Sequence, residues 1–332
     1  MKSTTTNLID ILRYVRKHDS KGEAKFINDY LLPKINGLGY SPEMDMAGNI
    51  WVETAPKEQS PFLFVSHIDT CHQRDDGTLT TVIENNIAKL SSNDVNHGCL
   101  GADDGVGIYC NLKMMEAGVA GTYLFTRGEE KGGIGAGHIA KKETHRLEGF
   151  LMSVEVDRQG TDEIIISQCY GECASEDYAN DLAKAIGMGH HASYMGVYTD
   201  VSEFAEVIPE NVNISAGYEN QHTVKENVNL LYVDQLVEKL IKVDWSSLRI
   251  VREPGDFGEQ EVGWWNWQQG AGSSSTSLSD FDKLNSYVAD NPERVAFFLE
   301  SMGVEQWEIE QAWNNGYDES PFDEGDLAVG MY

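Results

Sequence analysis

The chain has 332 residues, of which 41% are hydrophobic and 24% are charged. This length suffices for one large domain with a full core, or for one domain and a small appendage. The formal net charge is −29, and a surface of this sign repels the phosphates of nucleic acids and anionic membranes. We therefore expect no nucleic acid and no membrane among its partners, whereas cationic ligands such as metal ions suit the charge.

The N-terminal segment predicts a helix of the folded protein. Its apolar residues are interrupted by Asp10, Arg13 and Arg16, so it has the pattern of an amphipathic helix and lacks the continuous apolar stretch of a signal peptide. No run in the sequence approaches the roughly 18 apolar residues that a membrane span needs.

The cysteines are Cys71, Cys99, Cys110, Cys169 and Cys173. Because they are few and no export signal precedes them, we expect reduced thiols and a cytoplasmic protein. Cys169 and Cys173 lie four residues apart, but no second pair of ligands at suitable spacing follows, which disfavours a structural zinc site there.

Short β-rich runs alternate with helical patterns as far as about residue 250. In chain order, the expected elements are helices at 7–17 and 22–36, a strand at 62–65, a helix at 104–117, strands at 122–125, 150–154 and 164–166, and helices at 175–187 and 232–242. Such alternation predicts an α/β fold, a three-layer α/β/α sandwich with a central mixed, mostly parallel sheet. In such sheets, ligands gather at the carboxyl ends of the strands.

The composition changes after residue 250. Residues 270–277 have the composition of a flexible linker, and 291–314 have helical spacing in an acidic, tryptophan-containing context. We therefore expect two parts: a main α/β domain at 1–250, and a linker with a small helical C-terminal appendage at 251–332. A solvated tail is favoured over a module that docks a partner.

Polar clusters follow several of these strands and turns. His67 and Asp69, two residues apart on an extended segment, point to the same side, and a carboxylate there can fix the tautomer of a metal-bound imidazole. A hydrogen-bonded structural pair is the simpler interpretation of these two residues alone. Asp103 and Asp104 stand beside three glycines and before an apolar helix, where a helix N-cap is an equal alternative.

Three further clusters complete the pattern. Glu129 and Glu130 occupy a glycine-rich turn, a placement that suits one metal ligand and one proton carrier. Asp157 closes a strand, and His222 lies between a short strand-like run and a later helix. Two histidines and three carboxylates at strand ends supply the nitrogen and oxygen ligands that zinc, cobalt or manganese accept.

The order of these motifs resembles that of the co-catalytic zinc exopeptidases of the M20, M28 and M42 type. The most specific stretches are Ser-His-Ile-Asp-Thr (66–70), Leu-Gly-Ala-Asp-Asp (100–104) and Gly-Glu-Glu-Lys-Gly-Gly-Ile-Gly-Ala (128–136), and 220–226 is similar to the last motif of the family. The resemblance covers about residues 5 to 245 and does not reach the tail.

The resemblance implies a role for each matched residue. Asp103 bridges two divalent metal ions, Zn²⁺ first, with Co²⁺ or Mn²⁺ as alternatives. His67 and Asp157 complete one metal site, and Glu130 and His222 complete the other. Asp69 orients His67, and Glu129 is the general base. The family also implies a cis peptide bond between Asp103 and Asp104, and Tyr198-Thr199-Asp200 matches a supporting aspartate loosely.

One departure from the family concerns the spacing of its motifs. Only 42 residues separate Asp157 from Asp200, which leaves no room for the lid domain of typical M20 enzymes, so we expect an M28-like architecture. The 35 residues between His67 and Asp103 include an expected hairpin, 78–83 with 88–90, that can form one wall of the site.

The function that follows is metal-dependent hydrolysis of amide bonds. An exopeptidase, specifically an aminopeptidase on short peptides, is favoured. A carboxypeptidase or a deacylase of N-acyl amino acids is the alternative and needs a cation such as Arg127, Arg158 or Lys131 for the substrate carboxylate. A non-catalytic binding protein is disfavoured because Asp103 and Glu129 are both present, and a single-metal transferase similar to glutaminyl cyclase is a minor option. An oligomer is compatible with the sequence.

Overall fold

The computed structural model describes residues 4–169, 171–258, 288 and 295. The chain divides into two units, Met1–Ala271 and Gly272–Tyr332, and the architecture below is that of the first. The expected linker at 270–277 lies outside the described residues, as does the expected helix at 291–314 apart from Val295, which is helical. None of the helices in the described part is long and apolar enough to cross a membrane.

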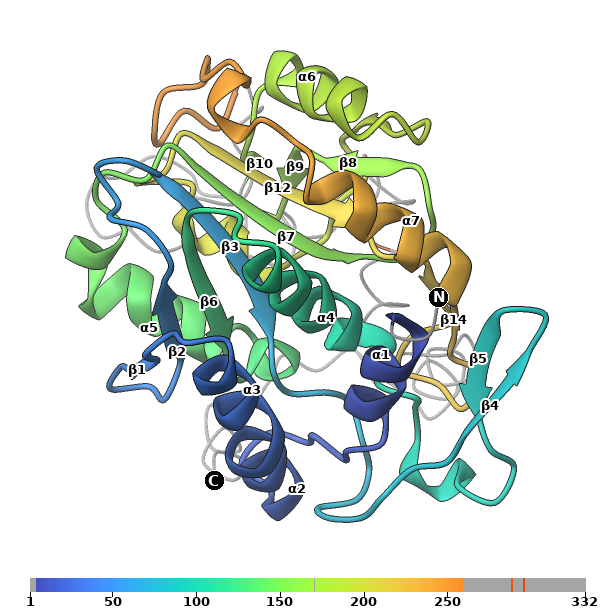
Figure 1. Cartoon of the computed structure of the whole chain (residues 1–332). Coiled ribbons are helices and arrows are strands. Elements are labelled where there is room, and N and C mark those ends of the chain that lie inside the picture. The colour runs from blue at the N-terminus through green and yellow to red at the C-terminus, as the bar shows by residue number, and fades with distance from the viewer. Residues whose placement is uncertain (1–3, 170, 259–287, 289–294, 296–332) are drawn as a thin grey trace, which may run out of the picture. The chain divides into compact units, whose positions relative to one another are not determined.

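The first unit is built on an eight-stranded sheet with the order β1-β2-β6-β3-β7-β12-β8-β11 (Figure 1). The strands in this order are Glu43–Met44, Ile50–Glu53, Thr122–Thr126, Phe62–His67, Met152–Arg158, Glu210–Ser215, Glu163–Ile165 and His191–Ser193. The pairs of β3 with β6 and β7, of β7 with β12, and of β8 with β11 are parallel, while the other neighbours are antiparallel. The sheet is therefore mixed and mostly parallel, as predicted.

Both faces of the sheet are covered, which confirms the three-layer α/β/α sandwich. On β3, Phe62 and Phe64 join one buried apolar cluster and Leu63 and Val65 join the other, since successive side chains of a strand point to opposite faces. The first cluster contains residues of α1 (Thr4–Leu12), α4 (Ala102–Glu116), α6 (Glu176–Ile186) and α7 (Leu230–Leu240). The second contains residues of α5 (Ile134–Lys142) and of the 3₁₀ helix Asp200–Phe204. Figure 1 shows α4 and α7 in front of the sheet and α5 behind it.

The observed helices differ from the expected ones at several points. The first helix ends at Leu12, although we expected it to continue to residue 17. The backbone beyond Leu12 bonds instead to a distant loop: Leu79 N donates to Arg13 O (2.9 Å), and Arg16 N donates to His72 Nδ1 (3.1 Å). The second runs from α2 (Lys21–Lys25) through a π-helical segment (Phe26–Leu31) to α3 (Leu32–Gly37). Helix α5 was not expected. Helix α4 is followed by Gly118 in the left-handed conformation (φ 78°), which is the expected stop.

A smaller antiparallel sheet, in the order β13-β14-β5-β4, brings two distant segments together. It contains the hairpin β4 (Thr81–Glu84) and β5 (Ile87–Leu90), together with β13 (Tyr218–Glu219) and β14 (Asn227–Asn229). Asn85 and Asn86 both have positive φ, as a two-residue type I′ turn requires. Because β14 pairs with β5, the chain that follows His67 is tied to the chain that flanks His222.

The segment between Asp157 and Asp200 belongs to the same unit. It contains β8 and β11 of the main sheet, helix α6, and the small hairpin of β9 (Ser167–Gln168) and β10 (Gly171–Glu172). The described residues of this segment, 158–169 and 171–199, form no separate domain. Arg252 also belongs to this unit, since its guanidinium donates to the carbonyls of Ala205, Ile208 and Pro209.

Candidate metal centre

Three neighbouring strands direct the predicted residues to one edge of the sheet. Strands β6, β3 and β7 are adjacent and parallel, so their carboxyl ends meet. His67 ends β3, Asp157 lies one residue before the end of β7, and Glu129 and Glu130 follow β6 after a short turn.

The first group consists of His67, Asp103 and Asp157. His67 Nε2 lies 3.0 Å from Asp103 Oδ1 and 3.5 Å from Asp157 Oδ1. The His67 side chain is fully buried, and those of Asp103 and Asp157 are 9% and 7% exposed. This group therefore offers one nitrogen and two oxygen donors in a confined space.

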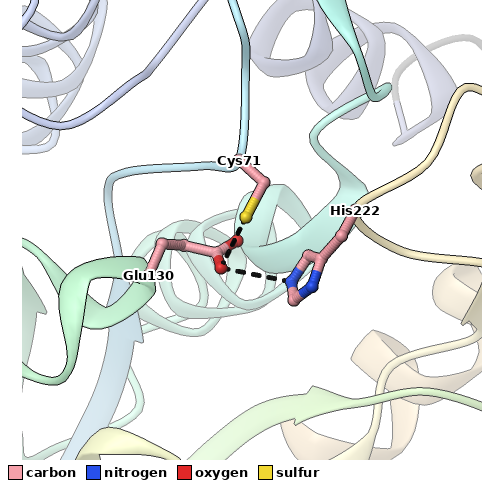
Figure 2. A group of neighbouring side chains, drawn as sticks. All are labelled: Cys71, Glu130 and His222. Carbon is pink, nitrogen blue, oxygen red and sulfur yellow. Dashed lines mark hydrogen bonds and ion pairs between the residues drawn. The ribbon is translucent and has the colours of Figure 1, made fainter. Parts of the chain in front are cut away.

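The second group contains Glu130, His222 and a residue that was not expected, Cys71 (Figure 2). His222 Nε2 lies 3.2 Å from Glu130 Oε2 and 3.1 Å from Asp103 Oδ2. Cys71 Sγ donates to Glu130 Oε2 at 2.9 Å. His222 has a positive φ of 62°, an uncommon conformation for a residue other than glycine.

Asp103 lies between the two groups. Its Oδ1 faces His67 and its Oδ2 faces His222, which is the arrangement that a carboxylate bridging two cations requires. The peptide bond between Asp103 and Asp104 is cis, as the resemblance implied.

A buried carboxylate holds the loop that carries Asp103. Glu226 is 1% exposed. It accepts hydrogen bonds from the backbone amides of Leu100, Gly101 and Asp103 at 2.7, 2.8 and 3.0 Å. The sequence places Glu226 at the end of the last motif, but only the fold shows that it holds the segment that carries Asp103.

Asp69 acts mainly on the glutamate turn. Its carboxylate accepts the amide hydrogens of Gly128, Glu129 and Glu130 at 2.7, 3.2 and 3.3 Å. His67 Nδ1 donates to the backbone carbonyl of Asp69 at 3.1 Å, whereas the carboxylate Oδ1 is 3.8 Å away. This hydrogen bond leaves Nε2 of His67 as the nitrogen that faces Asp103 and Asp157.

Glu129 lies apart from both groups of donors and is half-buried. Burial raises the pKa of its carboxyl well above the usual range, and the negative charges of Glu130 and Asp157 add to this, whereas His67 opposes it. A carboxyl with a raised pKa close to His67 and Asp157 suits a group that takes and returns a proton.

Further buried groups support Asp157. Tyr218 donates its hydroxyl to Asp157 Oδ1 at 2.9 Å. Thr199 Oγ1 lies 2.7 Å from Glu155 Oε2 and 3.1 Å from Asp157 Oδ2. Thr126 donates to Asp200, a fully buried aspartate whose pKa burial raises to about 7.

The crowding of carboxyl groups favours cations in this centre. Burial and the charge of Asp103 raise the pKa of Asp157 to about 6. Burial alone would lower the pKa of His67, but the charge of Asp157 and its hydrogen bond to Asp103 raise it well above the usual value. Glu130 Oε1 is buried without a hydrogen-bond partner in the described structure. Two divalent ions fit this donor set, one with His67, Asp103 and Asp157 and one with Asp103, Glu130 and His222.

Arg16 holds two segments of this centre together and was not expected there. It is fully buried, and its guanidinium donates to the backbone carbonyls of Ile68 (3.0 Å) and Gly101. It thereby joins the segment after His67 to the loop before Asp103. In the sequence it appears only as a charge that interrupts an apolar segment.

The three cations considered for a substrate carboxylate have different surroundings. Arg127 pairs with Glu23 and Asp19 at 2.6 and 2.8 Å, and Arg158 Nε donates to Glu163 at 2.8 Å. Lys131 is exposed. All five cysteines are free, and among the residues that the structure describes no metal-ligand group includes Cys169 or Cys173.

The comparisons with known proteins support the fold. No protein-family model and no curated protein sequence matches the chain. Solved structures do match it. The aminopeptidase PepT from Bacillus cereus superposes with a TM-score of 0.59 at 15% identity, covering 72% of this chain and 96% of that chain. A tripeptidase from Staphylococcus aureus gives a TM-score of 0.58 at 13% identity, covering 72% and 96%. The TET1 peptidase of Pyrococcus horikoshii gives 0.55 at 14% identity, covering 72% and 98%. The chain therefore has the fold of these peptidases.

Proposed function

We propose that the chain is a two-metal hydrolase of peptide bonds, an aminopeptidase that acts on short peptides. The observation that carries this proposal is the position of Asp103, whose two carboxylate oxygens each face a different histidine, 3.0 Å from His67 and 3.1 Å from His222. Each histidine has a second carboxylate beside it, Asp157 or Glu130. Two cations about 3.5–4 Å apart, bridged by one carboxylate, are the usual basis of this chemistry.

The matched solved structures support the substrate class. Their names describe an aminopeptidase from Bacillus cereus and a tripeptidase from Staphylococcus aureus. The substrate proposed for this chain is accordingly a small peptide with a free amino terminus.

Zn²⁺ is the proposed native metal, with Co²⁺ or Mn²⁺ as alternatives, because imidazole and carboxylate together accept all three ions. The cytoplasm is the proposed compartment, and the free state of all five cysteines supports it.

The mechanism assigns one task to each group of residues. When bound, the two cations acidify water and polarise the scissile carbonyl. Glu129 accepts the proton of the attacking water and then delivers it to the nitrogen of the leaving amine. Asp69, by accepting the amides of residues 128–130, fixes the turn that carries this base. Tyr218 and Thr199 hold Asp157 in place.

A carboxypeptidase or a deacylase of N-acyl amino acids is the second candidate. The observation that favours it is the exposure of Lys131 next to Glu130. This exposed ammonium follows Glu130 directly and is available to a substrate carboxylate. Arg127 and Arg158 are less suited to that task because both already pair with glutamates.

One screen tests both candidates. The protein is loaded with zinc or cobalt and incubated with dipeptides that have a free amino group, a blocked amino group or a blocked carboxyl group, and the released amino acids are quantified. An aminopeptidase hydrolyses the first and third sets. Hydrolysis of the amino-blocked set without hydrolysis of the carboxyl-blocked set would favour the second candidate, and no turnover of any set by metal-loaded protein would exclude both. Glu129→Gln is the control for a contaminating peptidase.

A further inference from the structure

Cys71 lies inside the second donor group, although no motif called for it. It follows β3 by four residues and is half-buried. Its Sγ lies 2.9 Å from Glu130 Oε2, which itself lies 3.2 Å from His222 Nε2. Figure 2 shows the three side chains, from three separate segments, pointing toward one another. Each of the three residues offers one possible ligand atom, and these three atoms all lie within 4.8 Å of one another.

The surroundings of Glu130 give a second, independent indication of a ligand. The Glu130 side chain is only 5% exposed. Its Oε1 is buried and has no hydrogen-bond partner within the described residues. A buried carboxylate oxygen without a partner is costly unless something else, such as a cation, is bound to it.

The two donor groups therefore differ in number and in chemistry. The group around His67 has three donors from the protein, one nitrogen and two oxygens. The group around His222 has four donors: Cys71, Glu130, His222 itself and Asp103, whose Oδ2 lies 3.1 Å from His222 Nε2. Three protein ligands leave a position open for water or substrate, whereas four can close a tetrahedral site.

We propose that Cys71 is a ligand of the metal at Glu130 and His222, so that one ion of the pair is held by sulfur, nitrogen and oxygen donors and the other by nitrogen and oxygen alone. The proposal rests on the two-metal site proposed above. On binding, the thiol proton is released to solvent and the metal–sulfur bond takes its place. A thiolate favours Zn²⁺, Co²⁺ and Cd²⁺ over Mn²⁺ and Mg²⁺, so the two positions prefer different ions.

Cobalt spectroscopy of the full chain tests this proposal directly. Co²⁺ bound to a thiolate shows a sulfur-to-metal charge-transfer band in the near ultraviolet in addition to the visible ligand-field bands that any tetrahedral or five-coordinate Co²⁺ shows. We expect the charge-transfer band in the wild type and its loss in Cys71→Ser and Cys71→Ala. The Ser variant should still bind two ions, while the Ala variant should bind one of them more weakly by at least about tenfold, since even loss of an outer-shell partner of a ligand costs about 10–100-fold in metal affinity.

Two other cysteines provide matched controls. Cys99 is buried and Cys169 is exposed, and Cys99→Ala and Cys169→Ser should both retain the charge-transfer band. Far-ultraviolet circular dichroism of each variant verifies folding. Alkylation by iodoacetamide, mapped by mass spectrometry, gives a second measurement on the wild type: metal should protect Cys71 and leave Cys169 reactive.

The outcomes separate this proposal from the one on which it rests. Two bound cobalt ions with ligand-field bands and no charge-transfer band would overturn the role of Cys71 and leave the two-metal site intact. Retention of the band in Cys71→Ser, or its loss only in Cys99→Ala, would do the same. Absence of bound cobalt would overturn both proposals together.

Discussion

Glu129 and Glu130 are adjacent in the chain, yet their side chains have different surroundings. Glu130 lies against His222 and Cys71. Glu129 belongs to neither donor group, and the charges that act on it are those of His67, Glu130, Asp157 and Asp200. This difference supports the proposed roles, with Glu130 as a metal ligand and Glu129 as the proton carrier.

Substitution by glutamine should separate these two roles. Glu129→Gln should retain two metals and lower kcat by about a hundredfold or more, because a positioned base contributes about 10²–10⁴. Glu130→Gln should instead lose one metal. Elemental analysis and steady-state kinetics on one dipeptide measure both effects. An exchange of the two phenotypes would show that the assignment within the pair is reversed.

Arg16 should contribute strongly to stability through the two segments that it joins. Arg16→Met leaves the carbonyls of Ile68 and Gly101 without their donor and removes the cation beside Asp69, Asp104 and Glu226. We expect the free energy of unfolding to fall by roughly 3–5 kcal/mol, as when one partner of a buried charge network is removed.

The control for Arg16 is Arg13→Met, since the Arg13 side chain is 58% exposed. An exposed substitution of this kind should change stability by less than about 0.5 kcal/mol. Urea denaturation of both variants provides the comparison. Equal midpoints would show that Arg16 does not hold the centre together.

Among the elements, α5 sets the position of the glutamate turn. Its residue Gly135 packs against the chain that precedes Glu129: Gly135 N donates to Arg127 O at 2.8 Å. Asn49 bonds both segments, accepting from Arg127 N at 3.0 Å and donating to Gly135 O at 3.2 Å. A Cβ at Gly135 would lie 2.6 Å from Arg127 O, so any larger residue must displace either the helix or the turn.

We expect Gly135→Ala to lower the free energy of unfolding by about 1–3 kcal/mol, the usual cost of overpacking, and to lower kcat because Glu129 moves. Gly137→Ala, in the same helix, is the matched control, since the nearest atom to a Cβ there is 3.7 Å away. It should be neutral or stabilise the helix by up to about 1 kcal/mol. Calorimetry and kinetics on the pair test this, and a larger loss for the control would contradict it.

The sequence allows prediction of elements with a strong local signal. Strands β3 and β6 contain short continuous apolar runs, and β7 alternates apolar with polar residues. Their order in a parallel sheet explains why His67, Asp157 and the two glutamates come to one edge. Helix α5 escapes prediction because its first turns are rich in glycine, which has low helix propensity and masks the apolar period. Those glycines are needed for close packing, a property of the fold and not of the local sequence.

Contacts between distant segments are not accessible from the sequence in the same way. Cys71 is far from Glu130 and His222 in the sequence, and only the fold brings the three side chains together. In the same way, only the fold places Arg16 between the carbonyls of residues 68 and 101. The signals for them are faint: a cysteine just after His-x-Asp-Thr, and an arginine at the end of an apolar helix. No alternation of polar and apolar residues marks either one.

At the scale of the whole molecule, the composition changes at residue 250, but the contacts of the first unit extend further. The amides of Val251 and Arg252 both donate to Glu210 Oε1, at 2.8 and 3.0 Å. Arg252 also donates to three carbonyls of the 205–209 segment. These contacts favour a boundary after residue 252 for a fragment that folds alone.

Two truncations test that boundary. A chain ending after Gly258 should fold and keep most of its turnover of small peptides, because the proposed ligands and base all precede residue 223. A chain ending after Ile250 should lose several kcal/mol, since it removes two amide donors to Glu210 and the guanidinium that donates to three carbonyls. Thermal unfolding and kcat/KM measure both. If the 258 form keeps its metals but loses turnover, the tail shapes the active site.

The two carboxylates that organise the loops, Asp69 and Glu226, have a consequence for the kinetics of metal loading. Together they accept six backbone amide hydrogens, three from residues 128–130 and three from Leu100, Gly101 and Asp103. Both loops therefore keep their shape without a cation, and an arriving ion meets a receptor that is already assembled. Its entry rate in stopped-flow experiments should rise linearly with metal concentration, whereas a slow rearrangement before binding would impose a plateau.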